Sequence, residues 1–95
     1  MTDHELLEMA AKAAGIADGD VFYDMDSDKE WNPLTDDGDA LRLAVKLELE
    51  IRVFNGRAHA TALNVRTIEP LTNDPYVATR RAITRAAAAI GEAMP

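Results

Sequence analysis

The sequence contains no cysteine and a single tryptophan, and aromatic residues make up only 5% of its 95 residues. Without cysteine the chain can form neither a disulfide nor a thiolate zinc site, which fits a reducing compartment. No apolar stretch approaches the roughly 20 residues that a membrane helix needs. The first residues also lack the basic start and apolar run of a signal peptide. We therefore expect a cytoplasmic protein with no membrane partner.

Basic residues are also scarce in this chain. There are 10 lysines and arginines against 17 aspartates and glutamates, which gives a net charge of −7. A surface that binds DNA needs clustered lysine and arginine, so we expect no direct binding to nucleic acid. The same charge would suit a protein that occupies the basic, DNA-binding groove of another protein.

The length allows a single domain, residues 1–95, with one hydrophobic core. Hydrophobic residues make up 47% of the chain, which is a normal fraction for a globular protein. Much of this fraction is alanine. The core should therefore be small and depend on close approach of backbones.

The acidity of the chain is concentrated in residues 18–39. This segment has nine carboxylates and one base, so its formal charge is 1 − 9 = −8, whereas the whole chain carries −7. The concentration suggests a role for the segment but does not say which. The base is Lys29, and the carboxylates are Asp18, Asp20, Asp24, Asp26, Asp28, Glu30, Asp36, Asp37 and Asp39.

Two helices are predicted in the first half of the chain. Thr2 and Glu5 form a T-x-x-E capping box, and Gly15 is a natural stop for the helix that follows. Thr35 or Asp36 would cap the second helix and place two further aspartates in its first turn, where they complement the helix dipole. Between the helices, residues 18–20 should form a turn and residues 21–23 a short strand. The apolar stripes would be Leu6, Met9, Ala10 and Ala13 in the first helix and Ala40, Leu41, Ala44, Val45 and Leu47 in the second.

Asn55-Gly56 predicts a β-hairpin over residues 48–63 with a two-residue type I′ turn. One face would carry large aliphatic residues beside alanines and form a shallow trough for a helix. The other face would carry Glu50, Arg52, His59 and Thr61 and suits water or a partner. Residues 65–68 have the composition of a third strand, which Pro70 would end. The expected pairs are Phe54 with Arg57, Val53 with Ala58, Ile51 with Ala60, and Leu49 with Ala62.

Asp74-Pro75 predicts the start of the last helix, with a capping aspartate and proline at the first helical position. Arg80, Arg81 and Arg85 are expected on its outer side, where they could pair with the acidic segment. Together the elements predict an α+β fold, a small antiparallel sheet packed with about three helices in layers. The buried stripe of the last helix would be Tyr76, Ile83, Ala86, Ala87, Ile90 and Met94.

The sequence shows no catalytic constellation. Aspartates 24, 26 and 28 alternate like the start of a calcium loop, but Lys29 and Thr35 stand where an EF-hand has glycine and glutamate. The only histidines are His4 and His59, and the only serine, Ser27, lies between two aspartates. We therefore expect no cofactor and no enzymatic activity.

Trp31 has two interpretations. It could be a buried lid over an alanine-rich core, which the shortage of other large core residues favours. It could instead be an exposed aromatic anchor on the acidic surface. The candidate interaction surface comprises Trp31, Asp36, Asp37, Asp39, Arg80, Arg81 and Arg85.

Three stretches carry a resemblance to a known family. They are the motif W-N-P-L-T-D-D-G-D-A-L at residues 31–41, residues 76–83 with the alanines and Gly91 that follow, and residues 5–16. They resemble a family of small phage and prophage proteins of unknown function, in the group that includes the phage ABA-sandwich domain. The resemblance implies a layered α+β fold and a place of action inside a bacterial host cell. It implies no activity and no catalytic residues.

The leading hypothesis is therefore a non-enzymatic phage or prophage accessory protein that binds another protein of the host or phage, or its own copy in a homo-oligomer. One alternative is an acidic DNA mimic or inhibitor of a host nucleic-acid-binding protein. That alternative requires exposed carboxylates spaced like phosphates, roughly 6–7 Å apart. A third is a carboxylate-based module or enzyme that binds a divalent metal through Asp24, Asp26, Asp28 and His59.

Overall fold

The computed structural model describes residues 1–16, 22–25 and 28–95. The predicted turn at residues 18–20, Val21 of the predicted short strand, Asp26 and Ser27 lie outside these described residues. The fold is α+β, as predicted, with a two-stranded antiparallel sheet β1-β2 and a three-stranded antiparallel sheet β3-β4-β5. In chain order the elements are α1 (Asp3–Ala14), β1 (Tyr23–Asp24), β2 (Lys29–Glu30), α2 (Asp37–Lys46), β3 (Glu50–Phe54), β4 (Arg57–Ala62), β5 (Val65–Pro70) and α3 (Pro75–Ala93).

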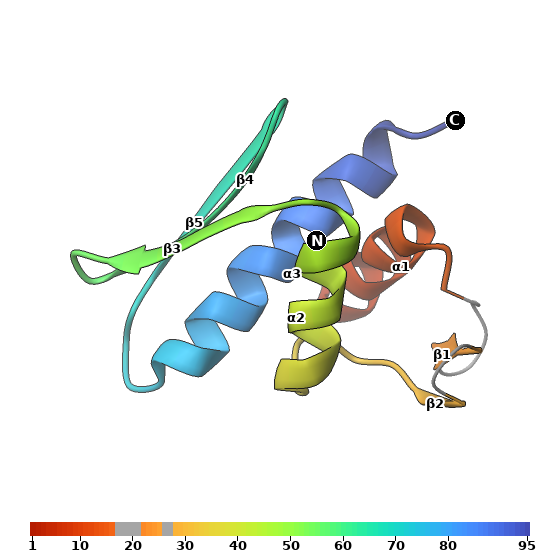
Figure 1. The fold of residues 1–95 in the computed structure, drawn as a ribbon, viewed down its shortest axis with the longest axis horizontal. Helices are drawn as coiled ribbons and strands as arrows, with labels where there is room; N and C mark the ends of the chain where they lie inside the picture. Colours follow the sequence, from red (N-terminus) through yellow and green to blue (C-terminus); the bar gives the residue numbers. More distant parts are fainter. Residues whose placement is uncertain (17–21, 26–27) are drawn as a thin grey trace.

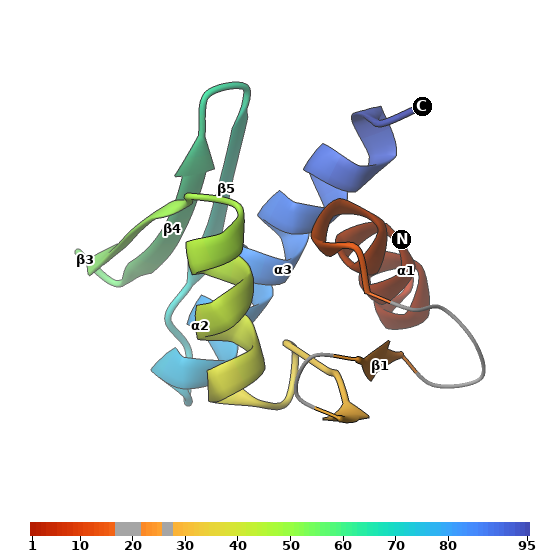
Figure 2. The same ribbon diagram turned by 45° about the vertical axis from the view of Figure 1, so that its right-hand side comes forward.

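Helix α3 is the centre of the molecule. The three-stranded sheet and α1 lie on opposite sides of it, and α2 lies beside it (Figures 1 and 2). Its buried positions are therefore spread around the whole helix instead of forming one stripe. They are all small or medium in size, which lets its neighbours approach closely: Ala78, Ala82, Ile83, Thr84, Ala86, Ala87, Ala88 and Gly91.

Helices α1 and α3 are in direct backbone contact at Gly91. A Cβ atom added to Gly91 would lie 1.9 Å from the carbonyl oxygen of Met9 and 3.3 Å from the backbone nitrogen of Ala13. Polar contacts follow at both ends, where Arg81 of α3 pairs with Asp3 and Lys12 donates to the carbonyl of Met94 at 3.0 Å. The absence of a side chain at residue 91 is therefore a requirement of the helix packing.

The three-stranded sheet follows the predicted register. Asn55 and Gly56 both have positive φ, 52° and 70°, as a type I′ turn requires. Three of the four predicted pairs, Phe54–Arg57, Val53–Ala58 and Ile51–Ala60, are present, whereas Leu49 precedes the first residue of β3. A third strand, β5, is present and reaches Pro70.

The predicted helix starts are also present. The Thr2–Glu5 capping box is complete, and the hydrogen bonds from Thr2 lower the pKa of the Glu5 carboxyl. Asp36 rather than Thr35 caps α2, and Asp74 caps α3. None of the helices in the described part of the chain has the length and apolar character needed to cross a bilayer.

The predicted apolar stripes were wrong at several positions. In α2, Leu43 is buried, whereas Leu41 and Val45 are 64% and 69% exposed, because the helix turns its 40/43/44 face toward the core. In α3, Tyr76 and Met94 are exposed, because Tyr76 lies in the first turn beside an open groove and Met94 lies just beyond the last residue of the helix. In α1 the buried positions are Leu6, Ala10, Ala11 and Ala14, while Met9 and Ala13 are half-buried.

Candidate functional site

Trp31 is a core residue. Its side chain is 4% exposed and meets the ring of Phe22 edge-on, with centroids 6.4 Å apart. Its backbone N–H donates to the Phe22 carbonyl at 2.8 Å. Burial, the favoured interpretation, is therefore confirmed, and Trp31 offers no exposed ring to a partner.

The loop after Trp31 is organised by Asn32 and Asp36. The side-chain oxygen of Asn32 accepts from the N–H of Leu34 at 3.0 Å, and its carbonyl accepts from the N–H of Asp36 at 2.9 Å. Asp36 then caps α2 by accepting from the N–H of Asp39 at 2.8 Å. This backbone hydrogen bond lowers the pKa of Asp36, and the positive charge of nearby Lys29 lowers it further.

Asp39 is buried although it is an aspartate, with only 1% of its surface exposed. One carboxylate oxygen accepts from the N–H of Asn32 at 2.9 Å, and the other accepts from Arg42 at 2.7 Å. The ammonium of Lys29 lies 3.5 Å from the second oxygen. Asp39 therefore ties the loop to the first turn of α2.

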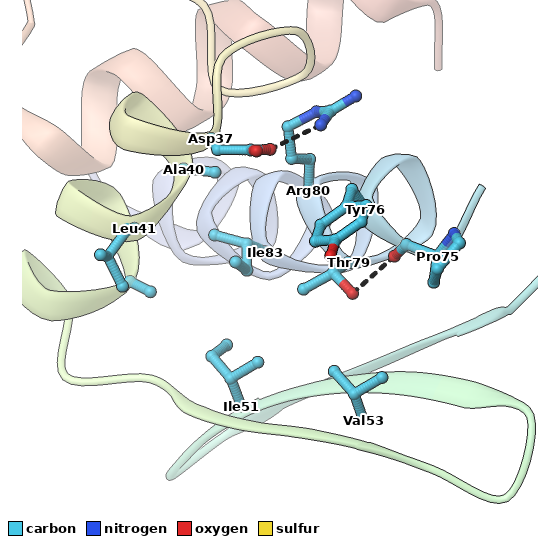
Figure 3. Close-up of a pocket in the computed structure, with 11 residues that line it drawn as sticks. Asp37, Ala40, Leu41, Ile51, Val53, Pro75, Tyr76, Thr79, Arg80 and Ile83 are labelled. Carbon is cyan, nitrogen blue, oxygen red and sulfur yellow. Dashed lines mark hydrogen bonds and ion pairs between the residues drawn. The ribbon is translucent and has the colours of Figure 1, made fainter.

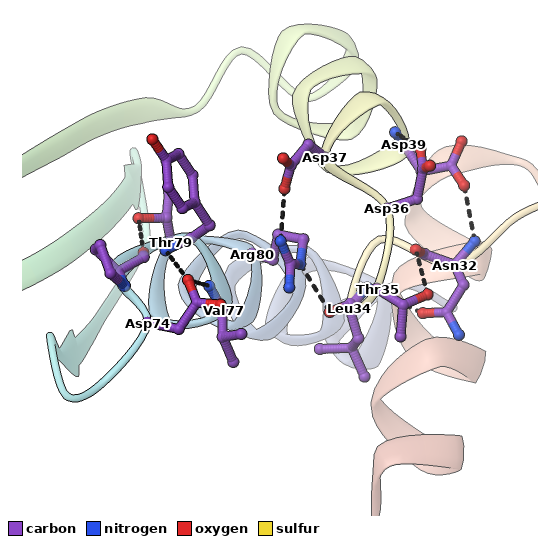
Figure 4. Close-up of polar contacts among 12 residues, drawn as sticks. Asn32, Leu34, Thr35, Asp36, Asp37, Asp39, Asp74, Val77, Thr79 and Arg80 are labelled. Atoms are coloured by element: carbon purple, nitrogen blue, oxygen red, sulfur yellow. Dashed lines mark hydrogen bonds and ion pairs between the residues drawn. The ribbon is translucent and has the colours of Figure 1, made fainter.

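Asp37 and Arg80 connect this loop to α3 (Figure 4). Arg80 donates from Nη1 to Asp37 at 2.6 Å and from Nε to the carbonyl of Leu34 at 2.9 Å. Its side chain is mostly covered, so its predicted position on the outer side of the helix was wrong. We refer to residues 32–39 together with Arg80 as the acidic clasp.

The other two arginines of the predicted interaction surface lie elsewhere. Arg81 pairs with Asp3 at 2.9 Å, and Arg85 pairs with Glu69 of β5. Of the seven residues of the predicted surface, the structure brings together Asp36, Asp37, Asp39 and Arg80 as parts of the acidic clasp, and it buries Trp31 in the core. The clasp residues bond to one another and to the backbone, so they serve the architecture of the fold.

The residues considered for a metal site are not assembled either. No group of three or more histidine, aspartate or glutamate side chains that could hold a metal ion occurs among the described residues. His59 stacks on Phe54 with ring centroids 5.2 Å apart, on the sheet. Asp28 accepts a hydrogen bond from Tyr23, which raises the pKa of the Tyr23 hydroxyl. Asp26 lies outside the described residues.

A groove that the sequence did not predict lies between α2, β3 and the first half of α3 (Figure 3). It encloses about 590 Å³. Leu41 of α2, Ile51 and Val53 of β3, and Tyr76 and Ile83 of α3 line it. Leu41, Val53 and Tyr76 are 64%, 50% and 67% exposed. The Asp37–Arg80 ion pair closes one end with two charged groups.

The groove exists because α3 packs against β4 and β5 and leaves part of β3 uncovered. Ala58 and Ala60 of β4 are fully buried under the helix, whereas Val53 in the neighbouring strand remains half-exposed. The broad apolar surface of α2 was a sequence signal for this site, because one helix face needs fewer apolar positions than this ten-residue helix has. Leu41 and Val45 are the surplus apolar residues, and of these two Leu41 lines the groove.

Comparison of the chain with protein-family models, with curated proteins and with solved structures finds no match.

Proposed function

We propose that this chain is a non-enzymatic module that binds another protein, and that the groove between α2, β3 and α3 receives the partner. One observation carries the proposal: the groove is apolar, and its rim leaves large side chains in water. Contiguous apolar surface of this kind is typical of interaction sites. Leu41 and Tyr76 contribute little to the core, so their apolar character serves a contact outside the chain.

The shape and chemistry of the groove favour a protein segment with apolar side chains on one face. Aliphatic walls on α2 and β3 suit an inserted aliphatic or aromatic side chain, as in the grooves that hold amphipathic helices. The Asp37–Arg80 pair at one end offers an acceptor and donors that can fix the orientation of the bound segment. In this proposal the acidic clasp builds the site, because it holds the start of α2 against α3.

The resemblance of residues 31–41 to phage and prophage proteins favours an accessory protein whose partner is a protein of the host cell or the phage. The DNA-mimic alternative gains no support from the clasp. Asp36 and Asp39 are held by bonds within the chain, and Asp37 is paired with Arg80, so these carboxylates do not form a row of free charges.

The proposal can be tested with two exposed leucines as a matched pair. Leu41 lines the groove, whereas Leu63 is fully exposed in the turn between β4 and β5, outside the groove. Leu41→Lys should weaken capture of a partner from bacterial lysate by about tenfold, which corresponds to about 1.4 kcal/mol. Leu63→Lys should leave capture unchanged. Equal capture by both variants would show that the groove is not the binding site.

A further inference from the structure

The two edges of the three-stranded sheet differ in how they are finished. Edge strand β5 ends in Pro70, which has no N–H, and Arg85 from α3 pairs with Glu69 and donates to the carbonyl of Ile68 at 3.2 Å. Among the described residues, edge strand β3 has hydrogen bonds only to β4. An edge strand with free backbone groups is a template for pairing with another strand.

The backbone groups of β3 that face this open edge can be identified. In the two-residue turn, Phe54 and Arg57 form the hydrogen-bonded pair that closes the hairpin. Hydrogen-bonded and non-hydrogen-bonded pairs alternate along an antiparallel ladder. The backbone N–H and C=O groups of Glu50 and Arg52 therefore bond to β4. Those of Ile51 and Val53 point away from β4, toward the open edge.

The charges of β3 lack ionic partners within the described part of the chain. Glu50 and Arg52 are exposed on the outer face of the sheet and take part in none of its ion pairs. The guanidinium of Arg52 lies 4.7 Å from the centre of the Phe54 ring, which holds it along the strand. These two opposite charges are two residues apart and share one face of the strand.

We propose that β3 pairs with the β3 strand of a second copy of this chain, antiparallel and about a twofold axis at Ile51. In this register Glu50 faces Arg52 of the second copy, and Arg52 faces its Glu50, which gives two reciprocal ion pairs. Ile51 meets its own counterpart, and the side chain of Val53 faces that of Leu49. The N–H of Leu49 already donates to the carbonyl of Ala44 at 2.9 Å, so the backbone pairing is centred on residues 50–52. The pairs formed by Glu50 and Arg52 are non-hydrogen-bonded ones, in which side chains come closest.

The neighbouring registers are excluded by charge. Sliding one β3 strand along the other so that the same faces still match places Arg52 opposite Arg52 in one direction and Glu50 opposite Glu50 in the other. Like charges directly opposite each other are destabilising. The strand sequence thus selects one arrangement out of three. The dimer has a six-stranded sheet with α3 of both copies on one face, and the groove walls of β3 meet at the axis. The inference goes beyond the proposed function and does not depend on it.

Charge reversal tests the pairing with matched variants. Sedimentation velocity across a concentration series should show a dimer for the unaltered chain. Glu50→Arg or Arg52→Glu alone places like charges opposite each other twice, and each should weaken dimerisation by about tenfold or more. An equimolar mixture of the two single variants should dimerise again, because every facing pair is once more opposite in charge. The double variant Glu50→Arg/Arg52→Glu should dimerise by itself for the same reason.

The mixture also serves as the control for folding, since each chain in it carries its own substitution. A chain that stays monomeric throughout the series would overturn the inference and leave the groove to its own capture test. A dimer that the single variants do not weaken, or that the mixture does not restore, would equally overturn it. Restoration in the mixture and in the double variant is the result that supports it.

Discussion

The two sides of α3 are held in different ways. Toward α1 the helix is in backbone contact, and Gly91 has no room for even one methyl group. Toward α2 and β3 it leaves a groove of about 590 Å³, and the elements are joined there by the acidic clasp. The difference shows that one alanine-rich helix can support a rigid interface on one side and an open site on the other.

The cause of this difference is the size of the facing side chains. Small residues on both helices let α1 and α3 approach until their backbones touch. On the other side, Arg80 spans the distance from α3 to the start of α2 through bonds to Leu34 and Asp37. Packing therefore fixes the first side, and polar bonds fix the second.

Gly91→Ala should have the largest effect. The added methyl would overlap the backbone carbonyl of Met9, which cannot move without displacing α1. We expect a loss of about 3 kcal/mol in the free energy of unfolding, a large share of a total of about 5–15 kcal/mol. Urea denaturation measures it. The control is Gly38→Ala in α2, where the new methyl meets only the ends of the Arg42 and Asp36 side chains and stability should change little. A stable Gly91→Ala variant would show that the two helices are not in backbone contact.

Asp39→Ala should have the next largest effect, because it opens the acidic clasp. The substitution removes the buried acceptor of the half-buried Asn32 N–H and of Arg42 and should cost about 2 kcal/mol. Asp37→Ala in the same helical turn is the matched control. Its carboxylate is well exposed, so loss of its ion pair with Arg80 should cost less than about 1 kcal/mol. Equal losses in urea denaturation would contradict the structural role of Asp39.

Thr67→Val tests the contact of α3 with the sheet. Thr67 of β5 is buried, and its hydroxyl donates to the carbonyl of Ala82 in α3 at 2.6 Å. Valine has nearly the same shape but no donor, so the free energy of unfolding should fall by about 1 kcal/mol. Thr61 in β4 makes no side-chain hydrogen bond within the described residues, and Thr61→Val should therefore be neutral or slightly stabilising. A neutral Thr67→Val variant would show that the bond to Ala82 adds nothing.

The cap of α2 should make stability depend on acid. Folding lowers the pKa of Asp36, mainly through the N–H of Asp39, so its contribution is fully present above the ordinary value of 3.8. That contribution should be lost as the pH falls through the lowered value of the folded state. Asp36→Ser keeps a cap that does not titrate. The difference in the free energy of unfolding between the unaltered protein and Asp36→Ser should be constant near neutral pH. Below pH 3.8 the unaltered protein should lose stability relative to the variant. A difference that stays constant at every pH would contradict the role of Asp36 as a cap.

The sequence predicted well those features that depend on residues within about four positions of one another. Thr2 with Glu5, Asn55 with Gly56, and Asp74 with its proline set helix starts and a turn through local bonds that the structure contains. The hairpin register followed from the turn, because a two-residue loop leaves only one way to pair its strands.

Features that depend on the placement of α3 could not be predicted. Both flanks of α2 are apolar, so nothing local to the helix says that Leu43 is buried and Leu41 exposed. Asp39 lies in the first turn of α2, where an aspartate is expected to complement the helix dipole, and its burial depends on the loop that folds over it. The groove likewise results from the position of a helix that lies far along the chain from α2 and β3. The residues of the acidic clasp were therefore predicted as an interaction surface, whereas in the structure they hold the loop and α2 against α3.

Leu41→Ala should have the smallest effect on stability, and it tests whether the groove side is open in solution. Leu41 and Leu43 lie two residues apart in α2, one over the groove and the other in the core. Truncation of Leu43 leaves a buried cavity and should cost about 2–5 kcal/mol. Truncation of Leu41 removes a side chain that is already mostly in water and should change stability by less than about 0.5 kcal/mol. Urea denaturation of both variants compares them directly. A loss for Leu41→Ala close to that for Leu43→Ala would mean that the groove is closed in the free protein, and α3 would then be packed alike on both sides.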